Sequence, residues 1–183
     1  MYSFVNQNKG ILFSCVLGIL LSYYAYVIET NKEKDESYEA MCDISEHMSC
    51  SKAFMSNYGK GFGIMGPLLG ETSTLNQPNS VYGMAFYSIV GLLFPSIAVE
   101  IFWKRMNTSS GCIQSPKVAK LQFWMSVLSN FGSLYLAYIL AFILHDFCVV
   151  CVSTYVVNLA LLILSLLRYK RLKELSSSHA KVN

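Results

Sequence analysis

Charged residues are scarce in this sequence of 183 residues: they make up 14% of it, and four long stretches contain none. The uncharged stretches are residues 10–28, 72–99, 121–144 and 147–167. Each exceeds the roughly 18 residues that indicate a membrane-spanning helix. One charge at the centre of such a helix costs about 2.5–3.5 kcal/mol on insertion scales, so gaps of this length rarely arise by accident. A soluble domain needs a larger charged surface, and the composition therefore argues against one.

Four uncharged stretches in so short a chain predict an all-α membrane protein with a bundle of four transmembrane helices. We expect these helices at about residues 10–29, 80–102, 120–143 and 147–168. Residues 1–183 then form one membrane domain with a 30–79 loop, a 103–119 loop and a 169–183 tail. The first loop contains a glycine- and aromatic-rich part, which favours a cap of short helices and turns on the bilayer surface. The first uncharged run is too long for a cleaved signal peptide, so we expect it to remain as a helix.

The charges that do occur are divided between the two ends of the predicted bundle. The segment between the first two helices holds eight acidic residues and four lysines over residues 29–80. The 103–119 loop and the C-terminal tail are dominated instead by lysine and arginine. The positive-inside rule therefore predicts that both termini and the 103–119 loop are cytoplasmic, and that the 30–79 loop faces the lumen. Because this topology accounts for the basic residues, we expect no nucleic-acid partner.

The predicted topology separates the six cysteines into two kinds. They are Cys15, Cys42, Cys50, Cys112, Cys148 and Cys151. One lies within the first helix, where a thiol packs as a small hydrophobic group, and one lies in the cytoplasmic loop. The other four fall on the lumenal side as two pairs. An oxidising lumen makes disulfide chemistry the default for such pairs.

Three interpretations of the two pairs compete. Cys42 and Cys50 suit a static structural disulfide. Four thiolates are also a zinc ligand set, but seven residues between two ligands fit that site poorly, so we expect no metal. Cys148 and Cys151 have the C-x-x-C spacing, which lets one thiol resolve a mixed disulfide formed by the other. This second pair favours redox chemistry.

The C-x-x-C pair lies at the mouth of the predicted fourth helix, which strengthens the redox interpretation. If Asp146 caps this helix, Cys148 lies in its first turn, where unpaired N–H groups and the helix dipole favour a thiolate. Cys151 and Tyr155 follow at spacings of three and four, so the three side chains share one face. A thiol at the water boundary, a second thiol in the bilayer and a phenol below them indicate a relay to a lipid-soluble partner such as a quinone.

Five segments carry a specific resemblance to a known family. They are MCDISEHMSCSKAF, YGKGFG, LNQPNSVYG, GSLYLAYIL and DFCVVCVSTY. Together they resemble the vitamin K epoxide reductase family in its animal form, over about residues 38–158. The resemblance implies a four-helix enzyme of the endoplasmic-reticulum membrane whose active site faces the lumen. It also implies reduction of vitamin K epoxide to the quinone and of the quinone to the hydroquinone.

The matching motifs assign the two cysteine pairs to two steps. The resemblance implies that Cys42 and Cys50 form an electron-shuttle disulfide, which a lumenal thioredoxin-like oxidoreductase reduces. It implies that Cys148 and Cys151 are the catalytic pair, and that Cys151 attacks the substrate.

The same motifs imply a substrate site. Asn79 and Tyr155 are implied to donate hydrogen bonds to the naphthoquinone oxygens, and Phe54 to close the pocket above the ring. Vitamin K quinone and epoxide are then substrates, and we expect no tightly bound cofactor. The family also implies contact with membrane lipid and binding of 4-hydroxycoumarin-type inhibitors.

Two other functions stay open on the sequence. The same relay run toward the quinone describes a quinone-coupled oxidase that forms protein disulfides. The third possibility is a non-enzymatic four-helix interaction protein with a structural lumenal disulfide, although such a scaffold does not require Cys148 and Cys151 at a helix mouth. Asp43 is expected to cap a turn, and His47 and His145 are expected to be solvated loop residues.

Overall fold

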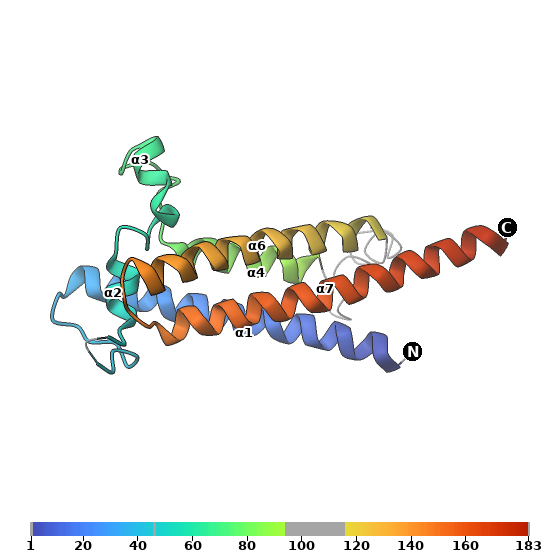
Figure 1. The fold of residues 1–183 in the computed structure, drawn as a ribbon, viewed down its shortest axis with the longest axis horizontal. Coiled ribbons are helices and arrows are strands. Elements are labelled where there is room, and N and C mark those ends of the chain that lie inside the picture. The colour runs from blue at the N-terminus through green and yellow to red at the C-terminus, as the bar shows by residue number, and fades with distance from the viewer. Residues whose placement is uncertain (1, 46, 94–115, 183) are drawn as a thin grey trace, which may run out of the picture.

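The computed structural model describes residues 2–45, 47–93 and 116–182, and the side chains of those between residues 8 and 177. This described part is helical and contains no strand. Its main helices are α1 (Tyr2–Lys34), α4 (Asn79–Leu92), α6 (Pro116–Phe142) and α7 (Val149–Val182). Between α1 and α4 lie α2 (Cys50–Met55), the 3-10 helix η1 (Gly61–Gly63) and α3 (Met65–Leu69). Figure 1 shows both termini at one end of the bundle and the short helices α2 and α3 at the other.

Among the described residues, three helices are long and apolar enough to cross a membrane. These spans are Asn8–Lys34, Pro116–Phe142 and Val149–Ser177. They confirm the prediction of an all-α chain with several membrane crossings. Helix α4 forms the first part of the predicted 80–102 helix. The remainder of that helix lies outside the described residues, as does the following loop as far as residue 115, with Cys112.

Helices α1 and α7 are longer than the uncharged runs that predicted them. Helix α1 continues to Lys34, and α7 continues to Val182, so the predicted 169–183 tail is helical through that residue. An uncharged run marks only the part of a helix that lies in lipid. The sequence has no glycine or proline after Gly132, and lysine, arginine and glutamate are good helix formers. Nothing in the local sequence therefore ends α7 at the membrane boundary.

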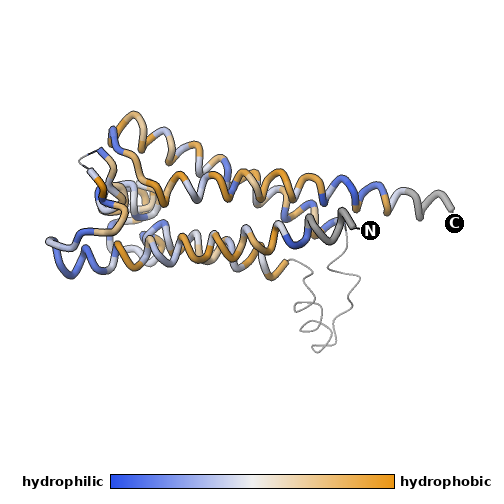
Figure 2. The backbone as a smooth tube through the Cα atoms, turned by 90° about the horizontal axis from the view of Figure 1, so that it is seen from below, coloured by the Kyte–Doolittle hydropathy of each residue, from blue (hydrophilic) through white to orange (hydrophobic). Residues whose placement is uncertain are grey.

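The helices pack around α1 and α7. Helix α1 contacts α4 and α7, α6 lies along α7, and α2 touches both α1 and α7 at the cap end. Figure 2 shows hydrophobic residues along the middle of the long helices and hydrophilic residues toward their ends. Many large apolar side chains point outward, among them Phe13, Leu128 and Ile163. Lipid tails solvate such side chains as well as a protein core does, so this outer surface suits a membrane.

Two buried clusters stabilise the bundle. The first joins α1, α4 and α7, and it contains Cys15 against Tyr87. Cys15 is buried inside its helix, as the sequence predicted. The second cluster joins α1, α2, α6 and the start of α7 beneath the cap, and it contains Cys50 and Cys148. One cysteine of each predicted pair therefore lies in the same core.

Candidate active site

The four predicted redox cysteines are present as one disulfide and two thiols. Cys42 and Cys50 form a disulfide whose Cα atoms are 5.8 Å apart. Cys148 and Cys151 are free. The predicted pairing of Cys42 with Cys50 is confirmed. In this structure the Cys42–Cys50 pair is therefore oxidised and the C-x-x-C pair is reduced.

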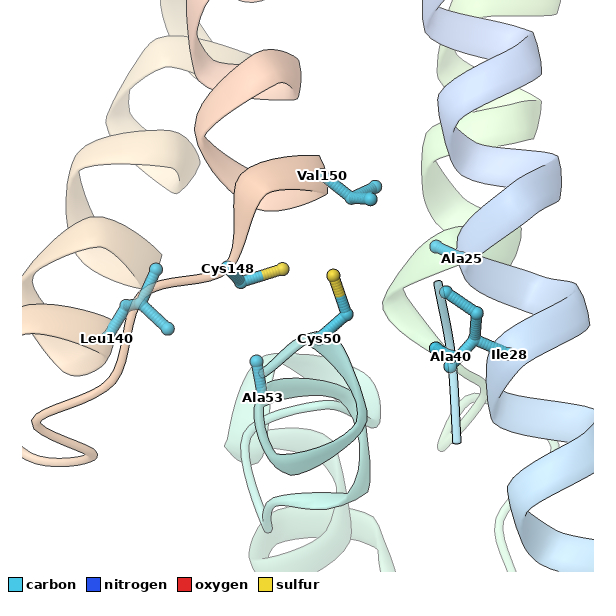
Figure 3. Packing of buried hydrophobic residues seen from close by; sticks show 8 residues of the cluster. All are labelled: Ala25, Ile28, Ala40, Cys50, Ala53, Leu140, Cys148 and Val150. Carbon is cyan, nitrogen blue, oxygen red and sulfur yellow. The ribbon is translucent and has the colours of Figure 1, made fainter. Parts of the chain in front are cut away.

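The two pairs meet through Cys50 and Cys148. Both side chains are fully buried, at 0% exposure, within the cluster beneath the cap. Figure 3 shows their sulfur atoms pointing toward each other, one from the first residue of α2 and one from the residue before α7. Ser49 fixes the start of α2, because its hydroxyl accepts a hydrogen bond from the Lys52 amide. Two sulfurs that face each other in one buried cluster suit a thiol–disulfide exchange between the two pairs.

Cys148 itself occupies the capping position of α7, so the cap by Asp146 that the sequence allowed is not formed. Helix α7 begins at Val149, and the Cys148 Sγ accepts a hydrogen bond from the Cys151 amide at 3.2 Å. Asp146 Oδ1 accepts instead from the Phe147 amide, which also donates to the His47 carbonyl. The bond to His47 holds Phe147 outside the helix. The first free N–H groups of α7 therefore point at the sulfur of Cys148.

This capping position makes Cys148 the more acidic thiol of the pair. A hydrogen bond from the Cys151 thiol lowers the pKa of Cys148, and the amides of Cys151 and Val150 lower it further. Burial and the carboxylate of Asp146 oppose the shift, but they are outweighed. A thiolate at a helix N-terminus is both a better nucleophile at neutral pH and a better leaving group than an ordinary thiol.

A cavity of about 690 Å³ opens between α1, α4, α6 and α7 beneath the cap. Cys151, Tyr155, Asn79 and Phe54 line it, so the structure brings these predicted site residues together. Cys148 does not line the cavity and faces the cap instead. Most of the other lining residues are aliphatic or aromatic. A pocket of this size and character suits a small, flat, apolar ligand with a few polar groups.

The side chain of Asn79 is already engaged in holding a loop over the cavity. Its Oδ1 accepts from the Phe62 amide at 2.8 Å, and its Nδ2 donates to the Tyr58 carbonyl at 2.6 Å. The loop between them passes so close to α2 that a Cβ on Gly59 would lie 1.8 Å from the Phe54 carbonyl oxygen. One N–H of the Asn79 amide remains for a ligand, because a primary amide has two. Asn79 therefore positions the loop as well as lining the cavity.

Tyr155 lies one turn beyond Cys151 on α7, as its spacing predicted. Its ring is partly buried, and within the described residues no protein group bonds to its hydroxyl. A tyrosine hydroxyl in an apolar wall normally has a hydrogen-bond partner. The group is therefore available to a ligand in the cavity, whereas the exposed His47 and His145 lie away from it.

Sequence reasoning missed a polar network in the wall of the cavity. Asn158 accepts from the Tyr87 hydroxyl at 2.9 Å and donates to the Ser133 hydroxyl at 2.8 Å. Asn130 donates to the backbone carbonyl of Asn158 and so ties α6 to α7. The signal was present, since Asn158 is the only amide side chain in the uncharged run 147–167. Polar side chains at membrane depth usually face the bundle interior and bond to one another.

Asp43 organises the segment that carries the disulfide, and its predicted capping role is confirmed. Its carboxylate accepts hydrogen bonds from the Ala40 and Ser51 amides and from the hydroxyls of Ser49 and Ser51. Partial burial opposes the charge, but these bonds outweigh it and lower the pKa of Asp43 to about 2. The bonds connect the chain on both sides of Cys42 to the start of α2.

Replacing Asp43 by asparagine is expected to lower the melting temperature at neutral pH, because two of the four donors would face an amide N–H. The pKa of the carboxyl is depressed in the fold, so its contribution is complete above about pH 4 and is lost as the pH falls toward 2. The difference between wild type and Asp43→Asn should therefore shrink over that interval. Thermal unfolding in detergent measures it, with Glu39→Gln as an exposed acidic control. If the difference in melting temperature between wild type and Asp43→Asn did not change between pH 7 and pH 2, the stabilising role of the Asp43 carboxylate would be contradicted.

Comparison with known proteins adds an independent finding. A family model described as Vitamin K epoxide reductase family matches residues 10–166. Vitamin K epoxide reductase complex subunit 1 of Mus musculus is 39% identical over 151 residues, which cover 82% of this chain and 83% of that protein. The protein of the same name from Rattus norvegicus is 40% identical over the same length and shares of both chains.

Proposed function

The chain belongs to the vitamin K epoxide reductase family of oxidoreductases, and from this we propose that it reduces vitamin K epoxide to the quinone and the quinone to the hydroquinone. The observation that carries the proposal is the meeting of the two cysteine pairs. Cys50 and Cys148 face each other in one buried cluster, while Cys151 lines the adjacent apolar cavity. A structural disulfide alone requires neither feature.

Electrons enter through the cap. A thioredoxin-like oxidoreductase reduces the Cys42–Cys50 disulfide, and Cys42 is its point of attack because Cys50 is fully buried. The freed Cys50 thiolate attacks a Cys148–Cys151 disulfide at Cys148. The facing sulfurs support this choice of atom. Cys42 then attacks Cys50, so that the shuttle pair is oxidised again and the C-x-x-C pair is reduced.

Chemistry on the substrate begins with Cys151. Its sulfur adds to a ring carbon of the quinone, and the electron pair moves to a ring oxygen, which takes a proton. Cys148 then attacks the Cys151 sulfur, and the carbon–sulfur bond breaks. The electron pair of that bond stays on the ring, which takes up a second proton. With the epoxide, the same two thiols supply two electrons and the epoxide oxygen leaves as water. The second N–H of Asn79 and the hydroxyl of Tyr155 donate hydrogen bonds to the developing oxyanion, and Phe54 covers the ring.

The same proposal includes the membrane, the orientation of the chain in it and the ligands of the cavity. The chain is a four-helix bundle of the endoplasmic-reticulum membrane with its cap in the lumen and both termini in the cytoplasm. The position of both termini at the end of the bundle opposite the cap supports this topology. Vitamin K enters from the lipid as a substrate, without a tightly bound cofactor. Inhibitors of the 4-hydroxycoumarin type compete for the cavity.

Turnover by the purified chain in detergent tests the proposal. With a dithiol as reductant, the wild type is expected to convert vitamin K epoxide to the quinone and then to the hydroquinone. Tyr155→Phe should turn over several-fold to about tenfold more slowly, because a hydrogen bond contributes roughly 0.5–1.5 kcal/mol. Asn79→Ala should lose more, since it also releases the loop that carries Gly59.

Tyr138→Phe is the matched control for the tyrosine variant. Tyr138 is 58% exposed on α6, does not line the cavity and keeps its ring contact with Phe142 after substitution. Its turnover should equal that of the wild type. An active wild type in which Tyr155→Phe and Asn79→Ala are both unimpaired would move the substrate site elsewhere, and an inactive wild type would refute the proposed reaction.

A further inference from the structure

Glu29 is a buried carboxyl group that the mechanism above does not use. It lies in α1 within the candidate span Asn8–Lys34, and it is only 3% exposed. The Ser80 hydroxyl, itself buried at the start of α4, donates a hydrogen bond to Glu29 Oε2 at 2.5 Å. A carboxylate in such surroundings is costly, and acidic groups at this depth usually serve proton or ion transfer. A packing role alone does not require an ionisable group here.

The Glu29–Ser80 pair leads directly to the cavity. Ser80 and Cys151 both line it. Ala25, one helical turn before Glu29 on the same face of α1, lines the cavity and points into the cluster around Cys50 and Cys148. A short polar path therefore connects a buried carboxylate with the cavity that holds the attacking thiol.

The chemistry of the C-x-x-C pair needs such a group. Cys151 must lose its proton to add to the ring, and Cys148 must be a thiolate to resolve the adduct. The hydrogen bonds at the start of α7 favour the charge on Cys148, and one of them comes from the Cys151 thiol. If Cys148 took the proton of Cys151, it would lose the charge that the second step needs. A third group is required to hold that proton.

We propose that Glu29, acting through the Ser80 hydroxyl, accepts the proton of the Cys151 thiol as its sulfur adds to the substrate, and returns it to the substrate oxygen. The inference rests on the reductase function proposed above. As the sulfur adds to the substrate, the thiol proton leaves its bond to Cys148 for the Ser80 hydroxyl, which passes its own proton to Glu29 Oε2, so a neutral hydroxyl and a carboxylic acid result. The reverse transfer protonates the ring oxygen and regenerates the carboxylate. Cys148 keeps its negative charge throughout. Glu29 acts through Ser80 and does not touch the substrate, so it is a positioning residue.

Three other charged or titratable groups act on this pair. Glu33 lies one turn further along α1, and Lys60 reaches it from the loop before η1 in an ion pair of 2.5 Å. Cys151 acts on Glu29 electrostatically from α7. Glu33 and Lys60 are each more than two-fifths exposed, so solvent screens them. Glu33→Gln is therefore a matched control, because it removes the same charge from the same helix outside the buried path.

The pH profile of turnover tests the inference in the full-length chain. Glu29→Gln keeps the shape of the side chain and an oxygen for the Ser80 bond, but it accepts no proton. At neutral pH its turnover should fall on the order of 100-fold, the usual size of a general-base contribution. The loss should shrink as the pH rises, because hydroxide and buffer then deprotonate Cys151. Ser80→Ala should behave likewise, Glu33→Gln should match the wild type, and the melting temperature of Glu29→Gln should be unchanged.

A second measurement needs no substrate and so separates this inference from the proposed reaction. In the reduced chain, a small uncharged maleimide labels Cys151 through its thiolate, and peptide mapping gives the rate. In the wild type, ionised Glu29 should add a route whose rate does not depend on pH, so labelling near neutral pH should be faster than in Glu29→Gln, whose rate should rise about tenfold per pH unit. Wild type and Glu29→Gln with the same labelling profile, or Glu29→Gln with unchanged turnover or a pH-independent loss, would overturn the proton-transfer role.

Discussion

Replacing Cys148 or Cys151 by alanine is expected to abolish turnover, while Cys42→Ala and Cys50→Ala keep substantial activity when the reductant is a small, membrane-permeant dithiol. In the proposed mechanism Cys151 forms the bond to the substrate and Cys148 breaks it, so neither is dispensable. The shuttle pair is proposed only to deliver electrons. In Cys42→Ala the remaining thiol of Cys50 still faces Cys148, and in Cys50→Ala the truncated side chain leaves space in front of the Cys148 sulfur.

The same four variants should all fail with a reduced thioredoxin-like protein as the only reductant. Such a protein reaches the half-buried Cys42 but not the fully buried Cys148. The comparison of the two reductants, with folding monitored by thermal unfolding, separates the delivery of electrons from the reaction with the substrate. Equal loss at all four positions with the small dithiol would show that the assignment of the two pairs to two steps is wrong.

The sequence predicted the membrane fold well because its signal is strong and local. A single charge at mid-bilayer is expensive, so uncharged runs reveal the spans directly. The ends of the helices carry no such signal. Helix α7 passes Leu167 into lysine- and arginine-rich sequence without interruption, and nothing in the composition marks the membrane boundary as an end to the helix.

The cysteine pairs were also predictable, whereas the details of the site were not. C-x-x-C spacing places Cys148 and Cys151 one turn apart on any helix, but which residue caps the helix depends on a distant contact. The bond from the Phe147 amide to the His47 carbonyl delays the start of α7 and gives the capping position to Cys148 in place of Asp146. A single sequence does not show that the two segments meet.

The burial of Glu29 also depends on a contact that the sequence does not show. In the sequence Glu29 is the last residue of the predicted 10–29 helix and the first of the acidic residues that follow, so nothing there marks it as buried. In the fold, α1 continues for five more residues to Lys34, and α4 brings Ser80 against the carboxyl group. Burial of a side chain at the edge of a hydrophobic run is decided by the neighbouring helix, which periodicity in one segment does not reveal.

The proposed transfer of electrons from Cys50 to Cys148 passes through a disulfide between their sulfurs, and this disulfide can be trapped. The intermediate decays when Cys42 attacks Cys50 or when Cys151 attacks Cys148, so removing both closes each exit. The double variant Cys42→Ala, Cys151→Ala is then expected to accumulate a Cys50–Cys148 disulfide in cells. Proteolysis without reductant, followed by mass spectrometry, detects the peptide around MSCSK joined to the peptide around DFCVV.

The double variant Cys42→Ala, Cys148→Ala is the control. It leaves Cys50 with Cys151, which lines the cavity one turn deeper on α7, and it should not form the corresponding bond. A disulfide requires Cα atoms within about 7 Å of each other, so the outcome reports geometry as well as chemistry. We expect the Cys50–Cys148 peptide to be the main species in the first variant, and we expect no Cys50–Cys151 peptide in the second. A folded first variant whose Cys50 and Cys148 are free, or are joined only to other molecules, would contradict the proposed transfer.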